Sequence, residues 1–409
     1  MNIYLVIILG ALSFQFILQT IVRILNIKSL SPILPAEFAN FYDPQEYQRS
    51  QKYTKTNALF NQILTTFSFI LVIAFILLGG FNYADLFVRS FVANPIAQGL
   101  IFMAILYLAN DLILLPFSLY HTFVIEEKFG FNKTSAKTFV IDQLKSYFLL
   151  IVIGGPILAL LLLFFEKAGQ YAWLLAWGLV AIFMVLIQPL FTLVIAPLFN
   201  KFTPLEPGGL KTAIENYAQK VKFSLKEISV MDGSKRSSHS NAYFSGIGKK
   251  RIALFDTLIA KHSIPELLAI VAHEVGHYKK HHIIKNTVIA IIHSGVLFFL
   301  LSLFIKNPEL FAAFKMEHTS IYASFIFFAL LYSPVEMIIS VVLNWLSRKY
   351  EYEADQFASQ TTQDPESMVL ALKNLSVSNL ANLTPHPWHV FLNYSHPPIL
   401  QRIKAIEKF

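Results

Sequence analysis

Seven long apolar stretches constrain what this 409-residue chain can fold into more than any other feature of its sequence. Each is long enough to cross a hydrocarbon core of about 30 Å as an α-helix. Their approximate bounds are residues 3–22, 58–80, 95–120, 147–165, 171–199, 287–305 and 321–346. Only 14% of the residues are charged, against roughly a quarter in soluble domains. The sequence therefore predicts an all-α polytopic membrane protein, whose first stretch is a retained helix rather than a cleaved signal peptide.

Lys and Arg are concentrated in alternate loops between these stretches. The loops after the first, third and fifth stretches are basic, as is the segment after residue 346, whereas the other loops carry few cations. Basic loops of membrane proteins remain in the cytoplasm. We therefore expect an N-terminus on the outside, with the large loop 200–286 and the C-terminal segment in the cytoplasm.

The chain contains no cysteine, which excludes disulfides, thiol catalysis and cysteine ligands to a metal. Any metal must therefore be held by histidine and carboxylate side chains. The formal net charge of +8 is explained by basic cytoplasmic loops. Since no nucleic-acid-binding motif is present, we expect the lipid bilayer and no nucleic acid among the partners.

The run His273-Glu274-Val275-Gly276-His277 has the spacing of a metal site on a helix. Two histidines four residues apart lie on one helix face, so both imidazoles can bind one zinc ion. Glu274 can then take a proton from a zinc-activated water. Ser263 with Glu266 three residues later predicts a capping box at the start of this helix. Because such a run also occurs by chance, other residues must complete the site.

A catalytic zinc needs a third protein ligand, and the chain after the seventh stretch supplies a candidate. The sixth and seventh stretches form a hairpin, so this segment returns to the membrane face that holds the zinc helix. Glu351 and Asp355 lie four residues apart on one helix face, where Glu351 can bind zinc and Asp355 can orient a ligand histidine. Glu353 is expected to point elsewhere. Taken alone, the segment could equally be a solvated charged helix.

Other histidines compete as ligands or as participants in catalysis. His281 would continue the helix face of His277, but the first and third histidines of that series would be about 12 Å apart, too far for one tetrahedral site. We therefore expect His281 and His282 to be solvated or interfacial. His396, which precedes two prolines, is a candidate donor to a developing oxyanion, with an ordinary surface histidine as the alternative.

Loop 200–286 contains the one sizeable soluble segment before the zinc helix. Residues 211–221 have helical character, and residues 227–231 are typical of a short strand. The alternation over 238–245, followed by 251–255, predicts a β-hairpin with its turn at Gly248-Lys249-Lys250. A peptidase needs an exposed strand edge that holds substrate backbone, and this hairpin is the candidate.

Five polar residues lie inside the apolar stretches. They are Asn110, Asp111, Gln188, His293 and Glu336. Such groups face a hydrated space or one another rather than lipid. A hydrated cavity between the helices and polar pairing that holds the helices together both remain open.

Four motifs, taken together, resemble a known family. They are the HEVGH run, SRKYEYEAD from Ser347, RSSHSNAYF from Arg236 and YSHPP from Tyr394, and further similar stretches lie at 42–54, 126–133 and 195–202. Together, and in their order along the chain, they resemble the integral-membrane zinc CAAX prenyl protease, type I, over nearly the whole chain. That family removes the last residues of prenylated CAAX proteins.

The resemblance implies a seven-helix α-barrel around a hydrated chamber, with a small gluzincin-like α+β zinc domain on the cytoplasmic side. It implies one zinc ion on His273, His277 and Glu351, with Glu274 acting as base and acid. It also implies that Asn241 holds substrate backbone, that His396 stabilises the tetrahedral intermediate, and that Asp355 and Arg402 support the ligands.

The chain is expected to divide into a membrane domain with five helices, residues 1–200, and a zinc metallopeptidase domain, residues 201–409, which includes the membrane hairpin 287–346. A long C-terminal extension and a dilysine-type tail are both missing from the sequence. We therefore expect a bacterial homologue in the inner membrane with its active site facing the cytoplasm, or the endoplasmic reticulum membrane for a eukaryotic chain.

The expected function is that of a membrane zinc metalloendopeptidase acting on a peptide or protein substrate, with or without a C-terminal prenyl group. One alternative is a general quality-control protease of membrane proteins. Another is a non-enzymatic channel or transporter with structural zinc, which would need four protein ligands. A site-2-type protease is disfavoured because Lys279 and Lys280 follow the zinc motif directly, and a heat-shock-type protease does not explain seven spans.

Overall fold

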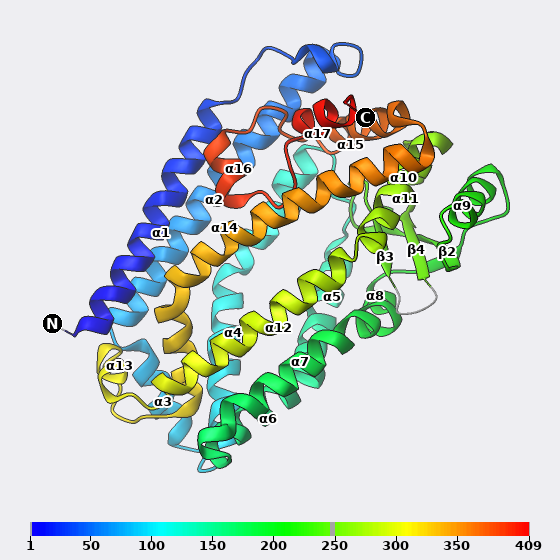
Figure 1. The fold of residues 1–409 in the computed structure, drawn as a ribbon. Helices are drawn as coiled ribbons and strands as arrows, with labels where there is room; N and C mark the ends of the chain where they lie inside the picture. Colours follow the sequence, from blue (N-terminus) through cyan, green and yellow to red (C-terminus); the bar gives the residue numbers. More distant parts are fainter. Residues whose placement is uncertain (1, 246–249, 409) are drawn as a thin grey trace.

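The computed structural model of the chain describes residues 2–245 and 250–408, and most of them are helical (Figure 1). Seven helical segments are long and apolar enough to cross a membrane, which confirms the seven predicted spans. They are Ile3–Lys28, Pro44–Leu77, Pro95–Glu126, Ala136–Lys167, Gly169–Phe199, His282–Phe304 and Ile321–Thr362. Several are longer than the apolar stretches, because helix continues into polar sequence beyond the membrane.

The first five spans are built from α1 (Ile3–Lys28), α2 (Pro44–Leu77), α4 (Pro95–Tyr120) with η2 (His121–Glu126), α5 (Ala136–Leu149) with η3 (Leu150–Gly154) and α6 (Gly155–Lys167), and η4 (Gly169–Tyr171) with α7 (Ala172–Leu190), η5 (Phe191–Ile195) and α8 (Ala196–Phe199). The last two are α12 (His282–Phe304) and α14 (Ile321–Thr362). Asp43 caps α2 by accepting a hydrogen bond from the Gln45 N–H at 2.8 Å. Most of the polar stretch 42–54 is therefore the first part of α2.

A four-stranded sheet lies outside the spans. Its strands are β1 (Phe202–Pro204), β2 (Leu225–Met231), β3 (Ala242–Ser245) and β4 (Lys250–Phe255), in the order β1-β2-β4-β3. β3 and β4 pair antiparallel, as predicted for the hairpin, but β3 covers only the second half of the predicted strand 238–245. Of the predicted turn, residues 248–249 lie outside the described residues, and Lys250 already begins β4. β3 is an edge strand of the sheet.

Shorter helices surround the sheet and close the far end of the molecule. Near the sheet lie α9 (Gly209–Lys220), α10 (Asp256–Ile259) and α11 (Ile264–Lys279). α15 (Pro365–Ser378) packs against α11, and α17 (Ile399–Ile406) packs against α15, whereas α16 (Pro387–Asn393) lies away from the sheet, against α1 and α14. At the far end lie α3 (Gly80–Arg89) and α13 (Pro308–Ala313). Single turns are η1 (Ala36–Phe38) and η6 (Gly233–Lys235).

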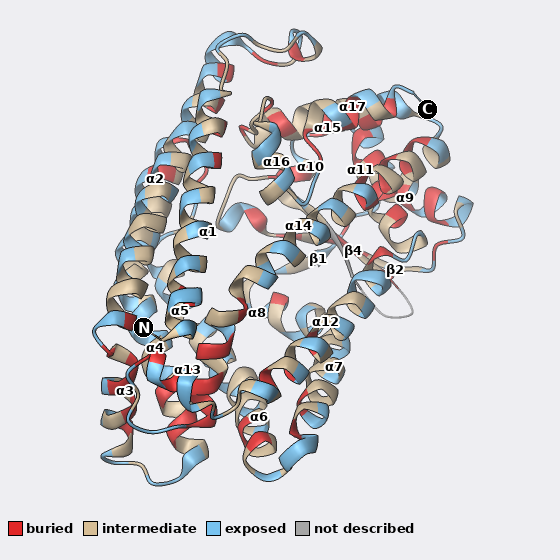
Figure 2. Ribbon diagram, turned by 60° about the vertical axis from the view of Figure 1, so that its left-hand side comes forward, coloured by how far each residue is buried: buried red, intermediate tan, exposed pale blue. Residues whose placement is uncertain are grey.

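Buried residues gather at the two ends of the molecule rather than along the spans (Figure 2). One core joins α9, β2, β4, α11, α15 and α17, and a second joins α3, α4, α13 and the first part of α14. Large apolar side chains on the spans, such as Phe14, Ile70 and Ile292, stay exposed in the isolated chain. This distribution fits helices that face lipid on one side and cavities on the other.

Polar residues inside the spans are partly paired and partly line a cavity. His293 Nε2 lies 3.3 Å from Glu336 Oε2 and 3.3 Å from the Tyr332 hydroxyl, and all three line a cavity of about 500 Å³ between α1, α12 and α14. Asp111 accepts hydrogen bonds from Gln143 at 3.0 Å and from Tyr147. Polar residues inside the spans therefore both line a cavity and pair with one another, the two interpretations that the sequence left open.

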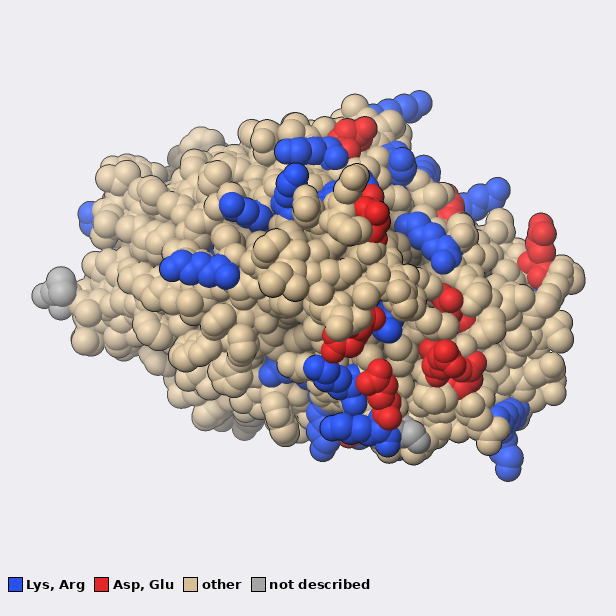
Figure 3. Space-filling view, turned by 90° about the horizontal axis from the view of Figure 1, so that it is seen from above, with Lys and Arg blue, Asp and Glu red and all other residues tan. Residues whose placement is uncertain are grey.

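The end of the molecule that carries α15 and α17 presents charges of both signs. Seen from above, Lys and Arg lie among Asp and Glu on this face (Figure 3). The positive net charge therefore does not form one continuous basic patch on this face.

Candidate metal centre and active site

Two helices bring the predicted metal ligands together. His273 and His277 lie one turn apart on α11, and Glu351 lies on the part of α14 that extends beyond the membrane span predicted from the sequence. Gly276 allows the two helices to approach closely, because a Cβ there would lie only 3.1 Å from the Ala354 Cα and carbonyl oxygen. No proline or glycine follows Pro334 within α14, so one uninterrupted helix carries Glu351 to α11.

The three side chains converge with the geometry that a metal ion requires. The Nε2 atoms of His273 and His277 are 3.1 Å apart, and Glu351 oxygens lie 3.5 Å and 3.2 Å from them. Ligands about 2.1 Å from a tetrahedral zinc would be roughly 3.4 Å from one another. Glu351 Oε2 is buried without a hydrogen-bond partner among the described residues. The donor set therefore fits a divalent cation, which would satisfy both facing imidazoles and this oxygen.

Asp355 and Arg402 fix the orientation of His273. The His273 Nδ1–H donates to Asp355 Oδ1 at 2.8 Å, which leaves Nε2 directed at the metal position. Arg402 donates to both Asp355 oxygens, at 2.8 Å and 2.6 Å, and its Nη1 lies 3.4 Å from Glu351. Burial lowers the pKa of His273, but the nearby carboxylates of Asp355 and Glu351 outweigh burial and raise the pKa to about 9. A bound metal must therefore displace a proton from His273.

The partner of His277 differs from the expectation. α11 ends at Lys279, and His281 adopts a left-handed conformation (φ 58°) before α12, so His281 does not continue the histidine series of α11. The break turns His282 back toward the site, where its Nδ1 lies 3.0 Å from His277 Nδ1 and its Nε2 lies 3.0 Å from Glu353. His281 is exposed as expected, whereas His282, expected to be solvated or interfacial, is buried and not solvated. Glu353 points away from the converging metal donors, as predicted, and contacts His282 instead.

The contacts of His282 define one consistent arrangement of protons. Glu353 accepts from the His282 Nε2–H, so His282 Nδ1 is free to accept from the His277 Nδ1–H. His277 Nε2 then presents its lone pair to the metal position. Stacking of His282 on Tyr350, with ring centroids 4.1 Å apart, holds the ring in place. Each histidine ligand thus has a hydrogen-bond partner that sets its tautomer.

Glu274 opens onto a cavity of about 160 Å³ beside the metal position. His273, Glu351, Asn241, His396 and Arg402 also line this cavity. Desolvation raises the pKa of Glu274, against the attraction of His273 and His277. A carboxylate with a raised pKa beside a metal position is suited to accept and return a proton near neutral pH.

His396 and Asn241 border the same cavity from two different segments. His396 Nε2 lies 3.4 Å from Glu351 Oε1, and 67% of its side chain is exposed. Asn241 precedes the edge strand β3, and its Oδ1 accepts from the Ala242 N–H at 2.8 Å. The structure therefore brings all eight predicted site residues to one centre: the three ligand candidates, Glu274, Asn241, His396, Asp355 and Arg402.

Comparisons with known proteins match both halves of the chain. Residues 23–201 match the model of the CAAX prenyl protease N-terminal domain with five membrane helices, and residues 204–409 match that of peptidase family M48. The chain is 34% identical to CAAX prenyl protease 1 of Saccharomyces cerevisiae, over 92% of this chain and 88% of the yeast protein. The chain belongs to the CAAX prenyl protease 1 family.

Relatives from other organisms agree with this assignment. The chain is 39% identical to a CAAX prenyl protease 1 homologue of Oryza sativa, over 77% of this chain and 74% of the rice protein. It superposes on the crystal structure of Ste24p from S. mikatae with a TM-score of 0.92 at 32% identity, covering 99% of both chains. These relatives are eukaryotic, so they lend no support to the expected bacterial origin. As a family member, the protein is a membrane metallopeptidase.

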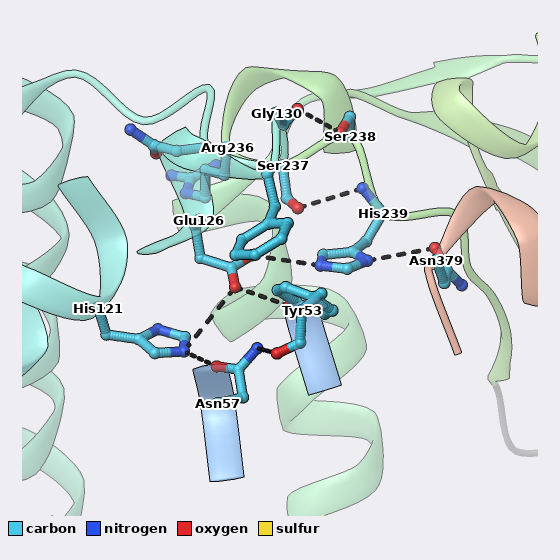
Figure 4. Close-up of polar contacts among 12 residues, drawn as sticks. Tyr53, Asn57, His121, Glu126, Gly130, Arg236, Ser237, Ser238, His239 and Asn379 are labelled. Atoms are coloured by element: carbon cyan, nitrogen blue, oxygen red, sulfur yellow. Dashed lines mark hydrogen bonds and ion pairs between the residues drawn. The ribbon is translucent and has the colours of Figure 1, made fainter. Parts of the chain in front are cut away.

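In this protein, a cluster of polar residues connects the segment before β3 to the membrane helices (Figure 4). Glu126, at the end of η2, accepts from the Tyr53 hydroxyl at 2.7 Å and lies 3.3 Å from His239 Nε2. On its other side His239 Nδ1 lies 3.2 Å from Asn379, which also bonds both backbone groups of Ser240 at 3.1 and 3.3 Å. These contacts hold the segment that leads into Asn241.

Main-chain bonds reinforce this connection between distant stretches of sequence. The Lys133 N–H donates to the Arg236 carbonyl at 3.0 Å, and the Ser238 N–H donates to the Phe131 carbonyl at 3.0 Å. Arg236 in turn donates to both oxygens of Asp142 in α5 at 2.6 and 2.9 Å. Contacts between the stretches 126–133 and 236–240 therefore fix the position of the edge strand β3 relative to the membrane helices.

The partner of His277 can be tested by mutation. Replacing His282 by Gln is expected to weaken metal affinity about 10- to 100-fold, because His277 loses the acceptor that fixes its tautomer. Competition with a chromophoric chelator on the purified protein measures this affinity. His281→Gln, at the exposed neighbouring position, is the matched control and should bind metal like the unmodified protein. Equal affinities for both variants would refute the role of His282.

Proposed function

We propose that this protein is a zinc metalloendopeptidase that trims the C-terminus of CAAX-type substrates. His273, His277 and Glu351 would hold the zinc ion. The observation that carries this proposal is the convergence of these three donors, each histidine with its outer nitrogen bonded, beside Glu274 in one cavity. Among the described residues three donors converge rather than four, which leaves a position for water and substrate, as catalytic zinc sites require.

Zinc, when bound, supplies a Lewis acid that polarises a peptide carbonyl and makes a water molecule more acidic. Glu274 accepts the proton of the attacking water at its carboxylate and returns it to the leaving amine. His396 donates from Nε2–H to the oxygen on which negative charge develops. Asp355 and Arg402 keep His273 in the required tautomer, and His282 with Glu353 does the same for His277.

The edge of β3 is the proposed binding site for substrate backbone. β3 is the last strand of the sheet among the described residues, so an added strand can pair along its outer side. Asn241 lies at the beginning of this edge and borders the cavity of Glu274. A peptide paired to β3 would therefore pass the catalytic carboxylate.

We further propose that the active site faces the cytoplasm, because Lys and Arg are concentrated in the loops and tail on the side of α11 and the sheet. The eukaryotic relatives favour the endoplasmic reticulum membrane over a bacterial inner membrane as the location. A C-terminally prenylated protein is the proposed substrate, since the yeast and rice relatives carry the name CAAX prenyl protease 1.

The test is cleavage of a farnesylated CAAX peptide beside its unprenylated twin by purified protein in detergent, with and without a zinc chelator. We expect chelator-sensitive cleavage of the prenylated peptide, restored by added zinc. Cleavage of both peptides at equal rates would retain the protease and favour a quality-control role without a prenyl requirement. Failure to cleave either peptide with zinc bound would contradict the proposed activity.

A further inference from the structure

A second cavity is lined by chain segments that continue from the lining of the catalytic cavity. Its volume is about 400 Å³, and it is bounded by α1, α2, the end of α15 and α16. Most of its polar lining consists of amide side chains, together with Tyr53, His389 and Arg23. Arg23 is the one formally charged residue among the described residues that line it. The cavity is thus polar and carries a positive charge without a lining carboxylate.

Arg23 has only neutral partners. Its Nη1 donates to Gln62 Oε1 and its Nη2 donates to Thr65 Oγ1 at 3.3 Å, and neither partner lines the cavity. Within the described residues no Asp or Glu pairs with it. A guanidinium has five N–H donors, so donors remain for a ligand in the cavity. A partly buried arginine on a membrane helix without a carboxylate partner is a candidate site for an anion.

Two segments connect this cavity to the catalytic cavity. Leu375 of α15 lines the catalytic cavity, and Asn379, one helical turn or about 6 Å further along, lines the cavity of Arg23. Asn393 and Tyr394 also line the cavity of Arg23, and His396 follows two residues later in the catalytic cavity. The two spaces are therefore neighbours along both chain segments.

The direction of β3 tells which end of a bound peptide approaches Arg23. β3 runs from Ala242 to Ser245, so a peptide added antiparallel runs with its carboxyl end toward Ala242 and Asn241. Beyond Asn241, the chain reaches Ser240, whose backbone bonds Asn379, a lining residue of the cavity. The carboxyl end of the peptide is thereby directed to the cavity of Arg23.

We propose that Arg23, in its amide-lined cavity, binds the free α-carboxylate of the substrate and so sets how far from the C-terminus the peptide bond is cut. This inference rests on the proposed peptidase function. An extended peptide advances about 3.4 Å per residue, so a few residues are enough to pass along α15 from Leu375 in the catalytic cavity to Asn379 in the cavity of Arg23. Arginine matches a carboxylate through paired N–H donors, and the surrounding amides supply further donors without a competing negative charge.

The experiment compares two farnesylated peptides that differ only at the C-terminus, one a free acid and one a carboxamide. The unmodified protein is expected to cleave the acid with a kcat/KM at least about tenfold higher, mainly through KM. Arg23→Gln should bring the ratio close to one by raising KM for the acid alone. Arg23→Lys, which keeps the charge, should retain part of the preference.

Lys28→Gln is the matched control, because it removes the same charge from an exposed position on the same helix. It should keep the full preference for the acid. Equal cleavage of acid and amide by the unmodified protein would overturn the proposal. So would an Arg23→Gln variant that loses both activities in the same proportion, which indicates a structural role.

Binding separates this inference from the proposed function. Fluorescence anisotropy of the same peptides on the Glu274→Gln variant measures affinity without turnover. A tighter affinity for the acid that depends on Arg23 would support the carboxylate site even if neither peptide were cleaved. Equal affinities for the acid and the amide would overturn the proposal and assign the cavity to another ligand. If the difference in affinity disappeared when phosphatidylserine was added to the detergent micelles, the ligand would be a lipid headgroup, and the proposal would also be overturned.

Discussion

Replacing Glu274 by Gln is expected to lower kcat by about 10³-fold while the protein keeps its metal. The amide has nearly the shape of the carboxylate but cannot accept the proton of the attacking water. Because Glu274 is not one of the three converging metal donors, metal content should be unchanged. Steady-state cleavage of the farnesylated peptide measures kcat, and metal analysis of the same preparation measures the metal content.

The control for this prediction is Glu215→Gln on α9, which removes a carboxylate from an exposed position outside the cavity. It should cleave at the unmodified rate. A Glu274→Gln variant with full metal and retained turnover would refute the assignment of Glu274 as the base. A variant that has lost its metal would show that Glu274 contributes to binding instead.

Replacing Arg402 by Met is expected to destabilise the protein by about 3 kcal/mol or more. Arg402 is buried, donates to both oxygens of Asp355 and lies 3.4 Å from Glu351. Burial lowers the pKa of Arg402, but the attraction of Asp355 outweighs burial and raises it, so the guanidinium stays charged. Its removal leaves the buried carboxylates of Asp355 and Glu351 without their shared cation.

Thermal unfolding in detergent, with and without zinc, measures this effect. Lys404→Met is the control, since Lys404 lies on the same helix but pairs with Glu37 at 3.4 Å on the surface, an interaction worth about 1 kcal/mol at most. The Arg402 variant should melt several degrees below the Lys404 variant. Zinc should reduce the difference in melting temperature between the two variants, because a bound cation replaces part of the lost positive charge. Equal melting temperatures would show that the buried ion pairs contribute no net stability.

The local features of the site could be predicted because they depend on helix periodicity. His273 with His277, and Glu351 with Asp355, are each four residues apart, and this spacing places each pair on one face of its helix. The helix of the metal motif does begin after Ser263, as predicted. The capping box is wrong, because the Ser263 hydroxyl donates to the Glu266 side chain, and His262 and Asn374 also contact that carboxylate.

Features that depend on a chain break or on distant contacts could not be predicted. The left-handed conformation of His281 has no sequence signal, since glycine and asparagine are the usual residues there, and this conformation is what turns His282 toward His277. β1 was missed because it has three residues and ends in Pro204. The neutral partners of Arg23, Gln62 and Thr65, lie on α2, and the sequence alone does not predict how α2 packs against α1.

Hydrophobicity, charge and residue spacing alone determined the seven spans, the metal motif and its carboxylate partner, because these are properties of single helices and of their transfer between water and lipid. Tertiary structure decided which hydrogen-bond partner each histidine ligand has, where the edge of β3 lies, and which cavities adjoin the catalytic one. The physical reason is that these features arise from contacts between different helices and strands, such as His273 with Asp355, His277 with His282 and His239 with Glu126. Such contacts exist only once the helices have packed.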